Sequence, residues 1–176
     1  MADEHGLVTL IARTIGDWAQ PREAVHFGEP TGIALQCAAT ASPAPGAEVP
    51  PDLAAAPLEL QVLWKNYRDL RLFEDPAFGQ WGLHIFNPHE AAAATRMWSH
   101  DIRGDYRRGD IVVGEFLGDG ERLLVRSDPG LGDFGSVVVS LPLYSRSEWP
   151  VVASALLEFL DRFISMQGAK YWERPA

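Results

Sequence analysis

Residues 110–141 read DIVVGEFLGDGERLLVRSDPGLGDFGSVVVSL, a series of apolar and β-branched runs separated by glycine-rich turns. The runs at 111–117 and 122–125 flank the tetrapeptide GDGE at 118–121, and an Asp-Gly step readily adopts the positive φ angles of tight hairpin turns. The pattern predicts an antiparallel hairpin, followed by a further strand over residues 134–141. The segment contains no cysteine, histidine or lysine, so it predicts a sheet scaffold rather than a catalytic centre.

Helical periodicity predicts four helices beside these strands. Apolar side chains recur at three- and four-residue spacing in residues 7–18, 60–67, 91–98 and 152–163. A short apolar run at residues 80–86, bounded by glycine and by Asn-Pro, predicts another strand. Strands and helices in this order predict one α+β domain.

Capping residues predict where two of the helices begin. Asn87 is a favourable N-cap, Pro88 fits the first helical position, and Glu90 lies where the acid of a capping box reaches back. For the last helix, Ser147 is the predicted cap and Pro150 lies in the predicted first turn.

A length of 176 residues suits one compact domain that folds without disulfides or a structural metal. Composition divides this domain into three parts. Residues 1–37 form an N-terminal helix and extension, residues 38–57 an Ala/Pro-rich connector, and residues 58–176 the α+β core. The connector is predicted to be irregular and mobile.

The cellular compartment is predicted from what the sequence lacks. Cys37 is the only cysteine and has no intramolecular partner, and the start MADEHG lacks the basic and apolar regions of a secretory signal. No apolar run approaches the about 20 residues that span a bilayer. We expect a cytoplasmic protein that is not integral to a membrane.

The charge is strongly acidic, with 15 Lys and Arg against 24 Asp and Glu, for a formal net charge of −9. Such a surface repels nucleic-acid phosphates, so direct nucleic-acid binding is not expected. Residues 23–64 contain five acids and no Lys or Arg. Two interpretations stay open: a solvated face that aids solubility, or a surface that attracts a basic partner.

If the acidic surface binds a basic partner, six side chains are the first candidates for contact. They are Glu48, Asp52, Glu59, Asp128, Asp133 and Trp172. The first three lie in residues 23–64, and Asp128 and Asp133 lie in residues 127–145, which also lack Lys and Arg. Trp172 belongs to an aromatic pair near the end of the chain, which either docks back on the domain or binds something else. We expect it to dock.

Residues 130–137, GLGDFGSV, match the glycine patterns of dinucleotide-binding and protein-kinase loops. A dinucleotide site needs a helix directly after the glycines, whereas three consecutive valines predict a strand. A kinase needs a lysine shortly downstream, and the only lysines are Lys65 and Lys170. The segment is predicted to be a turn between strands, and no cofactor is expected.

Two histidines are the candidates for catalysis. His84 lies in the strand predicted at residues 80–86, and His89 lies in the first turn of the next helix. The sequence from His89 has alanine where a zinc-protease helix has its second histidine, so no metal site is predicted. General acid–base catalysis also requires a correctly positioned partner. We expect both histidines to be ordinary polar residues.

Several local strings, in this order, resemble the SUKH superfamily, which includes a fungal cell-wall synthesis regulator and many bacterial toxin-immunity proteins. The resemblance covers residues 49–173. Its recognisable strings are PPDL at 50–53 before the helix with Trp64, GQWG at 79–82, NPHE at 87–90, IVVG at 111–114, GDGE at 118–121, the closing helix with Phe159 and Leu160, and KYWE at 170–173.

The resemblance implies a single α+β domain with a mainly antiparallel sheet and helices packed against it. It also implies protein binding rather than catalysis, typically neutralisation of a nuclease or deaminase toxin. The acidic charge fits such a role, because nucleases that grip phosphate tend to be basic. The alternatives are a regulatory or scaffold module unrelated to toxins, and a hydrolase that uses His84 or His89.

Overall fold

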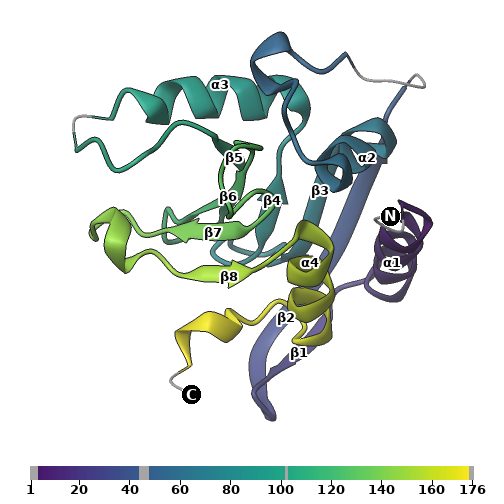
Figure 1. Ribbon diagram of the computed structural model, residues 1–176. Helices are drawn as coiled ribbons and strands as arrows, with labels where there is room; N and C mark the ends of the chain where they lie inside the picture. The colour runs from purple at the N-terminus through teal and green to yellow at the C-terminus, as the bar shows by residue number, and fades with distance from the viewer. Residues whose placement is uncertain (1–3, 44–47, 102, 175–176) are drawn as a thin grey trace.

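The computed structural model describes residues 4–43, 48–101 and 103–174. Within these ranges, an eight-stranded sheet runs through the domain, with every neighbouring pair antiparallel and the strands in sequence order (Figure 1). The strands are β1 (Arg22–His26), β2 (Glu29–Ala41), β3 (Tyr67–Glu74), β4 (Leu83–Ile85), β5 (Asp110–Phe116), β6 (Arg122–Arg126), β7 (Val137–Ser140) and β8 (Val151–Ala153). The helices are α1 (Glu4–Asp17), α2 (Leu58–Asn66), α3 (Pro88–Ser99) and α4 (Leu156–Ser165), with short 3-10 turns η1 (Pro51–Leu53), η2 (Arg146–Glu148) and η3 (Tyr171–Glu173). The predicted α+β class is confirmed.

The predicted hairpin is formed by β5 and β6. Ile111 pairs with Val125 and Glu115 with Arg122, and the connecting turn places Gly118 and Gly120 at φ values of 101° and 75°. A Cβ atom on Gly118 would overlap the carbonyl oxygen of Gln80, so only glycine fits there. The turn thus sets the register of the central strands.

Two apolar cores, formed by described residues, lie on opposite faces of the sheet. α1, α2 and α4 cover the larger one, which includes Val137 and Val139 of β7. The smaller core joins Val138 of that strand to Val112 and Trp149, close to α3. Because both faces of β7 are covered, its sequence is a continuous apolar run rather than an alternating one.

The segment after α4 binds both edges of the sheet. The backbone N–H of Val25 in β1 donates to the side chain of Gln167 at 2.8 Å. The hydroxyl of Tyr171 donates to the carbonyl oxygen of Val152 in β8 at 2.7 Å. Unpaired edge groups are sites where another chain can add a strand, so these bonds protect the two edges.

Lys170, in the same segment, is 5% exposed and pairs with the β5–β6 turn. Its ammonium group donates to the carboxylates of Asp119 and Glu121, the latter at 2.7 Å, and lies near the rings of Trp81 and Phe116. Burial lowers the pKa of Lys170, but the hydrogen bonds and charges of Asp119 and Glu121 outweigh it and hold the pKa above its usual value.

The capping prediction for α3 is confirmed. The side chain of Asn87 accepts hydrogen bonds from the N–H groups of His89 and Glu90, and the Glu90 carboxylate accepts from the N–H of Asn87. This reciprocal pattern starts the helix at Pro88.

The prediction for the start of the last helix is wrong. Residues 151–153 form β8, and α4 begins only at Leu156. The capping serine in this region is Ser145 rather than Ser147, and it caps the short turn η2. Pro150 lies outside α4, which begins six residues later. β-Branched Val151 and Val152 fit a strand, and pairing with β7 overrides their helical spacing.

The predicted connector at residues 38–57 is partly wrong. Residues 38–41 complete β2, because they pair with β3, and Pro51–Leu53 forms η1. Residues 44–47 of the predicted connector lie outside the described residues. The extension at 1–37 supplies α1, β1 and most of β2, and so belongs to the same sheet as the rest.

The turn assignment predicts that Gly120→Val destabilises the protein by about 1–3 kcal/mol, because a β-branched side chain is strained at positive φ. Gly132→Val is the matched control, since Gly132 lies outside the positive-φ region and a Cβ atom there would have open space around it. Urea unfolding of both variants measures the difference. Equal stabilities would contradict the assignment.

The pairing of Lys170 predicts that Lys170→Met costs about 3 kcal/mol, because the Glu121 carboxylate loses its buried partner. Adding Glu121→Gln should restore part of the loss. The raised pKa means that the contribution of Lys170 is fully present below its unfolded pKa of about 10.4 and is lost as pH rises through the folded value. Urea unfolding of the wild-type protein from pH 7 to 11 tests the pH dependence. If Lys170→Met has the same unfolding midpoint as the wild type at pH 7, the pairing is contradicted.

Candidate functional site

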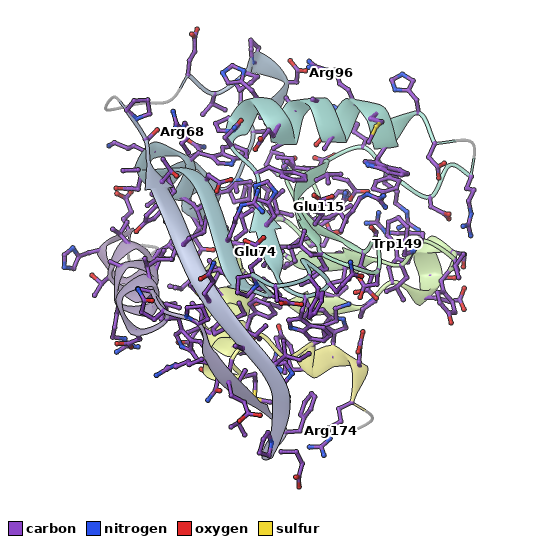
Figure 2. The ribbon with its side chains drawn as sticks, turned by 180° about the vertical axis from the view of Figure 1, so that it is seen from behind. Arg68, Glu74, Arg96, Glu115, Trp149 and Arg174 are labelled. Carbon is purple, nitrogen blue, oxygen red and sulfur yellow. The ribbon has the colours of Figure 1, made fainter. Side chains whose placement is uncertain are left out.

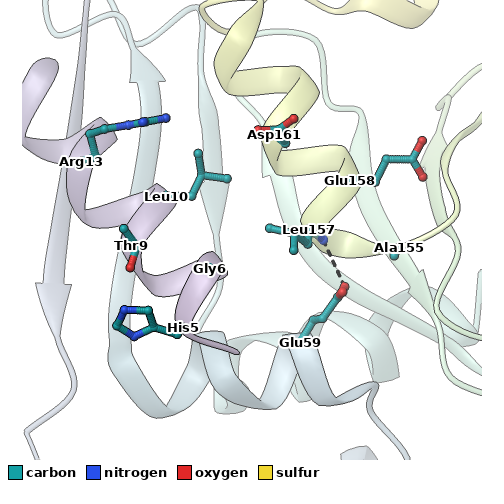
Figure 3. Close-up of a pocket in the computed structure, with 10 residues that line it drawn as sticks. All are labelled: His5, Gly6, Thr9, Leu10, Arg13, Glu59, Ala155, Leu157, Glu158 and Asp161. Carbon is teal, nitrogen blue, oxygen red and sulfur yellow. Dashed lines mark hydrogen bonds between the residues drawn. The ribbon is translucent and has the colours of Figure 1, made fainter. Parts of the chain in front are cut away.

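A groove of about 700 Å³ lies between α1 and α4, and Glu59 of α2 lies at one end of it (Figure 3). Leu10 of α1 and Leu157 of α4 are half-buried side chains that line it. A concave surface of this size, with apolar lining and a few polar groups, is typical of binding sites. The groove is therefore the candidate functional site.

The two walls of the groove carry opposite charges. On α1, Arg13 is the positively charged residue of the lining, and His5 lines the same wall. On α4, Glu158 and Asp161 are three residues apart and form the opposing acidic wall (Figure 3). A ligand with an apolar body and a positive charge would fit with its charge toward α4.

Two of the acids in the groove also stabilise the start of α4. The carboxylate of Glu59 accepts the backbone N–H of Leu157 at 3.0 Å, which supplies the cap that Ala155 does not provide. Glu158 accepts from the side chain and the N–H of Ser154, and these hydrogen bonds lower the pKa of its carboxyl group. Each of these two acids therefore already has a partner.

Asp161 differs from these acids. It is exposed, and its carboxylate makes no hydrogen bond or ion pair with any residue that the structure describes. Its charge is therefore available to a binding partner. The sequence places Asp161 on the polar face of α4, but helical spacing does not reveal that α1 lies opposite, so Asp161 was not among the predicted residues.

Besides Glu59, three of the predicted partner-binding acids have intramolecular partners. Asp52 accepts from Arg96 at 2.9 Å, and Asp133 accepts from the buried Arg126 at 2.9 Å. Asp128 accepts the N–H of Gly130 at 3.0 Å within its own loop. Only the pair of Asp52 and Arg96 joins residues distant in sequence. In all three cases the carboxylate is already engaged within the chain.

The other predicted residues lie apart from one another. Glu48 is exposed and makes no polar contact within the described ranges, and it lies near Asp52 at a shallow hollow beside α3. Glu59 lies at the groove. Trp172 packs on Phe116 and Phe159, with ring centroids 5.3 and 6.1 Å apart, so it docks on the domain as predicted. The six candidates do not form one surface.

His84 bridges neighbouring strands. Its Nε2 lies 2.8 Å from a carboxylate oxygen of Asp69, and its Nδ1 lies 4.0 Å from Glu115. Both ring nitrogens thus face carboxylates, and only 11% of the side chain is exposed. His89, in contrast, is exposed in the first turn of α3. The arrangement around His84 is that of a cross-strand polar contact.

Residues 130–136 of the glycine-rich segment form a turn, as predicted, but the strand that follows begins at Val137 rather than at the predicted residue 134. This strand, β7, comes directly after the turn, where a dinucleotide site has a helix. Across the described ranges, no three His, Cys, Asp or Glu side chains are arranged to hold a metal ion. No helix in those ranges is long and apolar enough to cross a membrane.

Cys37 belongs to β2, is part of the larger core and is 2% exposed. The N–H of Phe73 donates to its Sγ at 3.2 Å. Burial raises the pKa of the thiol to about 12, so the thiolate is scarce at neutral pH. Cys37 is therefore a core residue and not a nucleophile.

Comparisons of the chain with protein-family models, curated proteins and solved structures gave no significant match. The function of the chain is therefore inferred from the geometry of its fold and groove.

The burial of Cys37 predicts that stability falls between pH 9 and pH 12. The unfolded thiol ionises near 9.0 and the folded thiol near 12, so the stability is fully present below pH 9 and is lost as pH rises through the folded value. The loss approaches about 4 kcal/mol at about 1.36 kcal/mol per pH unit. Cys37→Ala should remove this part of the slope in urea unfolding. An unchanged slope, or rapid reaction of native Cys37 with a thiol reagent at pH 8, would contradict the assignment.

Proposed function

We propose that this chain is a non-enzymatic protein-binding domain, an immunity protein that binds and neutralises a basic toxin domain of the nuclease or deaminase type. The observation that carries the proposal is the α1–α4 groove, in which apolar side chains lie beside an acidic wall. The resemblance to the SUKH superfamily supports the toxin as partner. Cytoplasmic location is part of this proposal.

The groove has the composition that a protein interface needs. Buried apolar contacts at the centre of an interface supply affinity, and Leu10 and Leu157 are available for them. Charges at the rim steer the partner and set its orientation. The unpaired Asp161, on a chain with net charge −9, would attract a basic partner from a distance.

Two alternatives are distinguishable by experiment. A regulatory or scaffold module would use the same groove, but it would bind an endogenous partner in cells that lack the toxin. A hydrolase would lose its activity on His84→Ala or His89→Ala. The low exposure of the His84 side chain, 11%, favours a structural role for it over general base catalysis, which requires contact with a substrate.

The proposal predicts that association slows when salt rises from about 0.1 to about 1 M, as the Debye length falls from about 10 to about 3 Å. The partner is first isolated by affinity purification with the full chain from its native cell, and its binding is then followed by surface plasmon resonance. Asp161→Lys should reduce the association rate on the order of 3- to 10-fold. Leu157→Ala should mainly accelerate dissociation.

Glu29→Lys is the matched control, because Glu29 is exposed, has no polar side-chain contact among the described residues and lies at the β1–β2 turn. Glu48→Lys tests the one predicted acid that has no internal partner in the described ranges. Asp52→Lys and Asp128→Lys are less informative, since each also breaks an internal hydrogen bond. If neither salt nor Asp161→Lys changes the association rate, steering through the groove is refuted. A partner that is acidic, or a toxin that stays active in the complex, would refute the immunity role.

A further inference from the structure

A second, smaller pocket of about 200 Å³ lies on the opposite side of the sheet, and its walls are aromatic. Trp98 of α3 stacks with Tyr106 at a centroid distance of 5.9 Å, and Tyr106 meets Trp149 edge to face at 5.1 Å. Figure 2 shows Trp149 and Glu115 from this side, below α3. Three rigid rings thus enclose a space large enough for about one ring-sized group.

Arg122 of β6 and Arg103 are the two basic residues that line this pocket, and Arg103 already pairs with Asp105. The guanidinium carbon of Arg122 lies 3.4 Å from the centroid of the Trp98 ring, which fixes the group by a cation–π contact. A guanidinium carries five N–H donors in a planar fork that matches a carboxylate. The stacking on Trp98 therefore holds the donors in place before any ligand binds.

The guanidinium of Arg122 has no anionic partner, unlike those of comparable residues. Three arginines in the described ranges are half-buried, namely Arg71, Arg122 and Arg146. Arg71 pairs with Asp69, and Arg146 pairs with Asp110. No hydrogen bond or ion pair joins the side chain of Arg122 to another described residue, which leaves its donors free.

Three described carboxylates lie near Arg122: those of Glu115 and Asp105 are engaged elsewhere, and that of Asp101 makes no ion pair with it. Glu115 is opposite Arg122 in the strand register, but its carboxylate lies toward His84 Nδ1, at 4.0 Å. Asp105, in the pocket wall, accepts the N–H of Arg146 at 3.1 Å and lies 3.4 Å from the Arg103 guanidinium. None of these acids neutralises Arg122, so an external anion would be its partner.

The geometry points to a binding site for a carboxylate on a planar apolar body, with Arg122 as the donor and the aromatic walls as the packing surface. A carboxylate suits the site better than a phosphate, because Asp101 and Asp105 also line the pocket and repel a dianion more strongly than a monoanion. The carboxylate belongs either to a free aromatic acid or to the chain end of a peptide. The site is separate from the α1–α4 groove and does not depend on the proposed function.

The test is a titration of the full chain with benzoate, followed by the indole N–H signals of Trp98 and Trp149 in NMR spectra. Benzamide, which has the same shape without the charge, is the matched ligand. We expect saturable shifts with benzoate and at least 10-fold weaker binding of benzamide. N-acetylphenylalanine and its amide form the second arm. Tighter binding of this acid than of benzoate identifies a peptide end, and the reverse identifies a free aromatic acid.

Arg122→Gln should weaken benzoate binding at least 10-fold, whereas Arg68→Gln, exposed on β3 and outside the lining of both the pocket and the groove, should leave it unchanged. The comparison of benzoate with benzamide uses the unaltered chain, so it decides the matter even if Arg122→Gln fails to fold. Equal binding of benzoate and benzamide, absence of saturable shifts, or tighter binding of inorganic phosphate would each overturn the assignment.

Discussion

The ammonium group of Lys170 fixes the closing segment of the chain to the hairpin turn at the centre of the fold. It is buried between Trp81 and Phe116 and neutralised by Asp119 and Glu121. A buried cation without such partners would be strongly destabilising, so the turn and the closing segment hold their positions together. The acids of the Asp-Gly turn thus have a tertiary role besides their part in the hairpin.

The same closing segment also contacts both edge strands of the sheet. Gln167 and Tyr171, on either side of Lys170, bind backbone groups of β1 and β8. Strand addition at those edges competes with these bonds. The binding surfaces that we propose are concave instead, namely the α1–α4 groove and the aromatic pocket beside α3.

These two surfaces differ in charge because the helices and strands that form them bring different residues together. α4 presents the unpaired Asp161 in the groove, while β6 presents the unpaired Arg122 in the pocket. A net charge of −9 describes the molecule at long range, where steering acts. Contacts at short range depend on the local set of partners, so the net charge alone does not identify a binding surface.

Local sequence was sufficient for the α+β class, the β5–β6 hairpin and the capping box of α3, because each depends on neighbouring residues. The start of α4 and the end of β2 could not be predicted in this way, since pairing with β7 and β3 decides them. The same limit applies to the sites. Composition predicted acidic candidates, but Asp52, Asp128 and Asp133 have internal partners, and the groove and the Arg122 pocket form only when helices and loops distant in sequence pack together. Sequence specifies which charges exist, and tertiary packing determines which of them stay unpaired.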